Sequence, residues 1–154
     1  MKIQHYNVIL IDLPEVLPFT VRPDLKRIGL KKSFEKIDLA EKKLLEFVEI
    51  LEKNYKKEFY FIGEDIIEEK LFKRFIFSGG LLEIMVQAPS AISAHFINLE
   101  SAKKFVLALK RTLDKVVKDE KIREMLKSGI EFTSKKEETL TYDVWVRMKK
   151  IREI

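Results

Sequence analysis

The spacing of apolar residues predicts three helices. From about Phe34 to Lys56 apolar side chains recur every three or four positions, the pattern of an amphipathic helix. The same spacing predicts a second helix over about 99–117, with Asn98 as its N-cap. A shorter helix is expected to begin at Asp119 and to end at Gly129.

Shorter apolar runs between turn residues predict strands. Gly79-Gly80 and Pro89-Ser90 are expected to form tight turns between three of them, which indicates an antiparallel meander. Gly63 is expected to end a preceding strand, and residues 65–74 fit either a short helix or the start of an extended run. The expected strands are Tyr6–Leu13, Glu58–Ile62, about 71–77, Leu81–Ala88 and 91–97.

The structures of two further segments, 14–24 and 130–154, are predicted from other features of the sequence. Prolines at 14, 18 and 23 exclude a helix interior and predict an extended segment. At the other end, β-type residues favour a strand to about Met148, in a hairpin that turns through 135–138. A helical stripe through Leu140, Val144, Met148 and Ile151 is the alternative, and it would suit an oligomerisation helix.

The order of these elements predicts the fold class. Strand, helix, several strands, two helices and final strands are typical of an α+β domain. We expect residues 1–154 to form a single domain. It would contain a mostly antiparallel sheet of four or more strands with two or three helices packed on one face.

Composition narrows the class of protein. Hydrophobic residues make up 46% of the 154, enough for a core, while the 36% of charged residues exceeds the usual quarter or so. The charged residues are mainly Lys and Glu, a bias of hyperthermophiles, including archaea, that drift in an AT-rich genome also produces. The absence of Cys excludes disulfides, thiolate metal sites and cysteine nucleophiles, and suggests a cytoplasmic protein. We expect no membrane association, because no apolar stretch reaches 18 residues.

The net charge of +5 is unevenly distributed. Residues 22–32 and 103–127 are rich in cations, whereas 35–52 and 64–69 are rich in acids. An uneven basic surface favours a polyanionic partner, although a merely solvated surface explains such a charge equally well.

Signatures of enzymes are sparse. The five glycines fit no phosphate-binding loop, and neither His5 nor His95 has a second ligand-type residue three or four positions away. We therefore expect no cofactor, no metal and no catalytic residues. Glu83 is the single charge inside an apolar strand, and it is expected to pair with a cross-strand Lys or Arg. The alternative is a metal-dependent nuclease with a carboxylate site around Glu83.

The strongest positive signal is the alternation of aromatic and basic residues on strands. Such strands present flat faces to unstacked bases and cations to phosphates, as binding of a single-stranded nucleic acid requires, although most Phe residues must belong to the core. Stacking is expected from Tyr60, Phe75, Phe77 and Trp145, phosphate contacts from Lys73, Arg74, Arg147 and Lys149, and an extended basic track from Arg22, Lys26, Arg27, Lys31 and Lys32.

One segment resembles a known family. Residues 81–117, LLEIMVQAPSAISAHFINLESAKKFVLALKRTLDKVV, resemble the strand, Ala-Pro turn, strand and long helix of the ThermoDBP family and its archaeal relatives. The resemblance covers about a quarter of the chain. It implies a single-stranded DNA-binding protein without an OB-fold, in which helices and sheet form a cleft with an aromatic floor and basic flanks. It also implies a dimer or larger oligomer, but residues 139–154 lack the leucine heptads by which some members dimerise.

The expected partners are thus single-stranded DNA or RNA and further copies of the chain. A structural or assembly protein, whose exposed aromatic residues contact protein and not bases, is a third interpretation.

Overall fold

A computed structural model describes residues 3–11, 30–68, 70–86 and 90–137. Side chains are described for these residues except for 3, 30–41, 136 and 137. The elements in chain order are β1 (Ile3–Ile11), α1 (Leu30–Tyr55), β2 (Tyr60–Ile67), β3 (Lys70–Phe77), β4 (Gly80–Met85), β5 (Ala91–Phe96), α2 (Leu99–Val116), α3 (Glu120–Ser128) and β6 (Glu131–Glu137).

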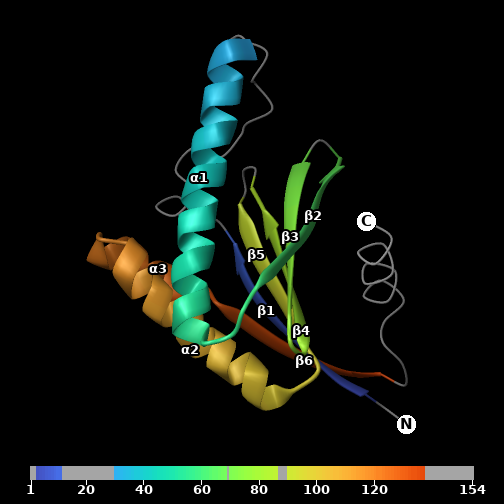
Figure 1. The fold of residues 1–154 in the computed structure, drawn as a ribbon. Coiled ribbons are helices and arrows are strands. Elements are labelled where there is room, and N and C mark those ends of the chain that lie inside the picture. Colours follow the sequence, from blue (N-terminus) through green and yellow to red (C-terminus); the bar gives the residue numbers. More distant parts are fainter. Residues whose placement is uncertain (1–2, 12–29, 69, 87–89, 138–154) are drawn as a thin grey trace.

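The described strands form one antiparallel sheet in the order β2-β3-β4-β5-β1-β6. Strands β2 to β5 are a meander, in which each strand pairs with the next along the chain. Strand β1 instead lies between β5 and β6, where Val8 faces Ala94 on one side and Phe132 on the other. The first and last strands of the described chain, β1 and β6, therefore lie next to each other at one edge of the sheet (Figure 1).

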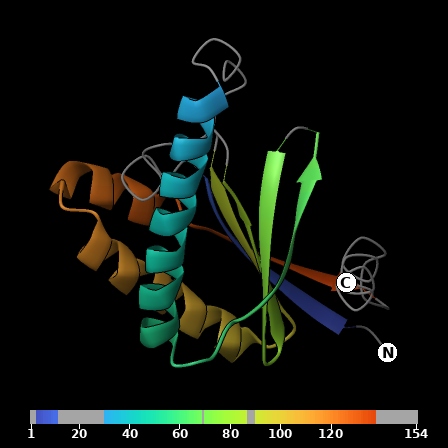
Figure 2. The same ribbon diagram turned by 45° about the horizontal axis from the view of Figure 1, so that its top comes forward.

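The helices cover one face of the sheet (Figure 2). Asn98 caps α2 by accepting a hydrogen bond from the Ser101 backbone N–H, and Asp119 caps α3 through the Ile122 N–H, as the sequence predicts. Gly129 ends α3. Among the described helices, none combines the length and the hydropathy that spanning a lipid bilayer requires.

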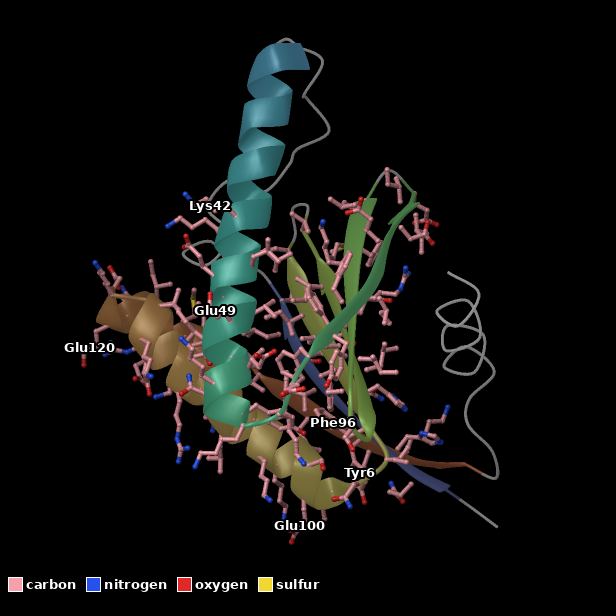
Figure 3. The ribbon with its side chains drawn as sticks, in the orientation of Figure 1. Tyr6, Lys42, Glu49, Phe96, Glu100 and Glu120 are labelled. Atoms are coloured by element: carbon pink, nitrogen blue, oxygen red, sulfur yellow. The ribbon has the colours of Figure 1, made fainter. Side chains whose placement is uncertain are left out.

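The core lies between the helices and this face. Phe47 and Leu51 of α1 and Phe105 of α2 pack with strand residues that are almost fully buried, such as Ile84 and Phe96. On the opposite side of α1, Lys42 and Glu49 point away from the sheet (Figure 3). The amphipathic pattern of both long helices thus follows from one buried stripe and one solvated stripe.

The turn between β3 and β4 requires both of its glycines. Gly79 has a φ of +85°, which side chains of L-residues disfavour. A Cβ atom at Gly80 would lie 2.2 Å from the Phe77 ring and 2.8 Å from the His95 carbonyl oxygen. The dipeptide therefore allows the aromatic ring of Phe77 to fold back over the turn.

The predicted α+β class, with helices on one face of an antiparallel sheet, is confirmed. Two local expectations are wrong. Gly63 does not end its strand, because β2 continues through it with a shift of register. The turn expected at 135–138 is also wrong over its described part, because β6 continues to Glu137 and pairs with β1 to its end. Of the two alternatives for residues 65–74, the extended run is observed in the described residues, since β2 and β3 form a hairpin with Glu68 in the left-handed region. The extended segment expected at 14–24 and the strand or helix expected beyond 137 lie outside the described residues.

Candidate nucleic-acid interface

Two aromatic residues of β3, Phe75 and Phe77, do not lie on the surface. Phe75 and Phe77 are each only 3% exposed, because they lie on the helix-covered face of the sheet. Phe77 contacts the rings of Tyr55, Phe59 and Phe96. The expectation that Phe75 and Phe77 offer stacking faces to bases is therefore corrected: both are core residues.

Two cations of β3, Lys73 and Arg74, are paired with acids of the neighbouring strands. The Lys73 Nζ lies 2.6 Å from Glu64 Oε2 and also stands over the Phe61 ring. The Arg74 Nε lies 2.9 Å from Glu83 Oε2, and its guanidinium is 3.8 Å from Asp65 Oδ2. The expectation that Lys73 and Arg74 contact phosphates is corrected accordingly, because each holds a carboxylate of its own sheet.

Glu83 has the partner that the sequence suggested first. It stands directly opposite Arg74 in the pairing of β3 with β4, and both side chains are about nine-tenths buried. Around Glu83 and elsewhere in the described residues, no three His, Asp or Glu side chains are grouped as metal ligands. The geometry thus gives Glu83 a structural ion pair, and it offers no support for a nuclease centre in this part of the chain.

Tyr60 is the one expected stacking residue that the described structure exposes. Its side chain is 58% exposed on the edge strand β2, next to Phe61, which is 55% exposed. The Tyr60 hydroxyl donates a hydrogen bond to Glu58 Oε2, and this bond raises the pKa of Tyr60. Acids nevertheless dominate this edge, since Glu58, Glu64 and Asp65 lie along it.

The other expected contact residues lie outside the part of the chain whose side chains are described. Lys31 and Lys32 lie in the first turn of α1, where side chains are not described. Six others lie outside the described residues: Arg22, Lys26, Arg27, Trp145, Arg147 and Lys149.

An apolar cleft lies between α2 and β6. It has a volume of about 380 Å³ and is lined by Lys103, Val106, Leu107 and Phe132, and we call it the α2–β6 cleft. Binding pockets for small organic groups commonly fall at roughly 300–1,000 Å³. The ring of Phe132 is 42% exposed and lies 5.9 Å, centre to centre, from the ring of Tyr6.

The cleft results from the helical periodicity of α2 and the alternation of side chains along β6. On α2 the stripe of Ala102, Phe105 and Leu109 is buried in the core, which leaves Val106 and Leu107 at its margin. On β6 the alternation of side chains places Phe132 on the same sheet face as Val8, its partner in β1. Phe132 therefore points toward the helix layer at the edge of the sheet, where the core ends.

Cations border this cleft. Lys103 lines it, Lys104 follows Lys103 in the chain, and Lys110 and Arg111 lie about two turns further along α2. None of these four makes an ion pair with another described residue, whereas Asp114, one turn later, binds Arg123 and Lys127. Within the described structure, these cations are therefore not held in ion pairs with acids.

One part of this cleft has a signal in the sequence. The cation-rich stretch at 103–127 contains its basic border, but the stretch carries no mark that distinguishes the border from a solvated face. Phe132 stands alone among polar residues in β6, and only the pairing of β6 with β1 brings it to α2.

The structure also joins the two histidines, which are 90 positions apart. His5 Nδ1 lies 3.1 Å from His95 Nε2, and His95 Nδ1 lies 2.8 Å from Asn7 Oδ1. His5 is only 1% exposed. Because one ring nitrogen must donate and the other accept, this contact fixes the tautomers of the pair and ties β1 to β5. Spacing along the sequence could not reveal it.

Comparisons with protein-family models, with curated proteins and with solved structures found no match for this chain.

Proposed function

We propose that this protein binds single-stranded nucleic acid, preferably DNA, without catalysing a reaction, and that the α2–β6 cleft is its contact site. The observation that carries the proposal is the exposed ring of Phe132 in an apolar cleft bordered by cations with no acidic partner among the described residues.

The chemistry of the cleft suits an unstacked base beside a phosphate. A base that stacks on Phe132 removes apolar surface of the base, of the ring and of Leu107 from water. Lys103 and Lys104 lie within the same turn of α2 and can neutralise the flanking phosphates. An apolar floor with a cationic border therefore provides both kinds of contact that a nucleotide offers.

A single strand fits this site better than a duplex does. Bases in a duplex are stacked on each other and paired, so that a ring inside a cleft reaches them only after they are unstacked. The features that the ThermoDBP resemblance implies, an aromatic floor and basic flanks between helix and sheet, support the same interpretation.

The test is a fluorescence-anisotropy titration with labelled single-stranded DNA, single-stranded RNA and duplex DNA at two salt concentrations. We expect salt-dependent binding of single strands and weaker binding of duplex. Phe132→Ala should cost about 1–3 kcal/mol of binding free energy, the usual value for one stacked base.

Two matched variants locate the site. Phe61→Ala removes a ring that is more exposed than Phe132 from the acidic edge β2, and Tyr60→Ala tests the stacking residue expected from the sequence. Both should bind as the parent protein does. Absence of salt-dependent binding to any strand would refute the function, and equal losses in the Phe132 and Phe61 variants would refute the site.

A further inference from the structure

One stripe of α2 borders the α2–β6 cleft and continues beyond the residues that line it. Helix residues three, four or seven positions apart lie on one side of the helix. Lys103 and Leu107 line the cleft, and Lys110 follows on the same stripe, three positions after Leu107. The stripe therefore carries one lysine before the apolar floor of the cleft and a second lysine after it.

Burial distinguishes Lys110 from the other cations beside the cleft. Lys110 is half-buried, whereas the other three are exposed. Side chains of a helix lean toward its N-terminus, so the stem of Lys110 covers the turn that contains Val106 and Leu107. Such a stem packs on apolar surface and keeps its ammonium in water. Arg111 stands about 100° further around the helix axis, on the side of α2 away from the cleft.

This cationic stripe is short. It begins after Leu99, and one turn beyond Lys110 it reaches Asp114, which is bound to two cations of α3. Lys103 and Lys110 are seven positions apart, which is about 10 Å along the helix axis. Two cations at this spacing, with an apolar floor between them, suit a ligand with two anionic groups and flat apolar groups between those anions.

We propose that the α2–β6 cleft takes a short stretch of a single strand that lies along α2, with one phosphate at Lys103, another at Lys110 and the intervening bases in the cleft. This inference deepens the proposed function and rests on it. Phosphates of one strand are about 3.4 Å apart along the axis of stacked B-form DNA, and further apart in an unstacked strand. A distance of about 10 Å therefore contains about three nucleotides at most, so that a short gap or tail suffices as the ligand.

The length of the bound stretch is measured by fluorescence anisotropy at low salt with 5′-labelled oligothymidylates of increasing length. With about three nucleotides between the two lysines, the affinity should rise steeply up to about four nucleotides. Beyond that length it should rise only as the number of binding positions on the strand increases. A steep rise that continues through much longer oligothymidylates overturns the short footprint.

The direction of the strand is tested by two variants at adjacent positions. Lys110→Gln should lower the slope of log K against log salt by about 0.7, the contribution of one phosphate of a single strand. Arg111→Gln should leave the slope unchanged, because that side chain lies away from the cleft. Lys110→Arg keeps the charge and should keep the slope of the parent protein. Circular dichroism verifies that each variant is folded.

The possible failures of the two proposals differ. An unchanged slope in Lys110→Gln, or an equal reduction in Arg111→Gln, would overturn the strand's course along the stripe while the proposed function stands. Absence of salt-dependent binding to any oligothymidylate would overturn the proposed function, and this footprint with it.

Discussion

Two regions of this molecule contain aromatic and basic residues side by side, and the fold treats them in opposite ways. On β3 the rings of Phe75 and Phe77 are buried, and Lys73 and Arg74 are held by Glu64 and Glu83. In the α2–β6 cleft, Phe132 is exposed, and the cations beside it lack acidic partners in the described structure.

The difference shows what alternation along a strand can and cannot indicate. It assigns side chains to two faces, but the layer that covers a face decides whether they are core or surface. For cations, the acids on the neighbouring strands decide in the same way whether the charge is available to a ligand. A basic aromatic strand in the interior of a sheet is therefore weaker evidence for binding than one exposed ring at the edge of the sheet.

The largest expected effect is on the free energy of unfolding, and it distinguishes the buried ring of Phe77 from the exposed ring of Phe132. Phe77→Ala should lower the free energy of unfolding by about 3–5 kcal/mol, because it leaves a cavity among Tyr55, Phe59 and Phe96. Phe132→Ala should lower it by about 1 kcal/mol or less, because that ring is already partly in water. Urea denaturation measures both, and equal losses would contradict the contrast.

The next effect, also on stability, distinguishes Arg74, a buried cation paired with Glu83, from Arg111, an exposed cation of α2. Arg74→Met should cost about 3 kcal/mol of stability or more, since Glu83 stays buried after losing its arginine. Arg111→Met, on the exposed side of α2, should change stability by no more than about 0.5 kcal/mol. Adding Glu83→Leu to Arg74→Met should recover much of the lost stability. If it does not, the loss has a cause other than the broken ion pair.

A smaller effect concerns the salt dependence of binding. Lys103→Gln should reduce the slope of log K against log salt by about 0.7, the contribution of one neutralised phosphate in a single strand. Lys73→Gln should leave the slope unchanged, because the Lys73 ammonium is engaged by Glu64. Anisotropy titrations at several salt concentrations provide the slopes. A lower slope in the Lys73 variant would indicate that β3 contacts the nucleic acid.

The smallest effect tests the electrostatics of the β2 edge. The hydrogen bond to Glu58 raises the pKa of Tyr60, so Glu58→Gln should lower that pKa toward its ordinary value. The difference in ultraviolet absorbance between each protein and its Tyr60→Phe counterpart, followed through alkaline pH, isolates this group. An unchanged pKa would show that Glu58 does not hold the hydroxyl in solution.

The elements of this fold could be predicted from the sequence because their signals are local. Asn98 and Asp119 mark helix starts by their own side chains, and Gly79-Gly80 marks a turn by its backbone. The partnership of Glu83 was also predictable in kind, since a buried charge requires an opposite one.

The site could not be predicted because its parts are distant along the chain. Lys103 and Phe132 come together only through the insertion of β1 beside β6, and the same insertion joins His5 to His95. Alternation along β3 places Phe75 and Phe77 on one face and Arg74 on the other, which agrees with their partners Leu82, Gly80 and Glu83 in β4. The sequence did not say that the first of these faces is covered by helices.

The place of β1 in the sheet also has a kinetic consequence. Strands β2 to β5 pair with near neighbours, so their hairpins close short loops and can form early. Strand β1 must wait for partners that begin some 80 residues or more further along the chain, Ala91–Phe96 and Glu131–Glu137. During synthesis it leaves the ribosome before all the other strands, and we expect it to be among the last to dock.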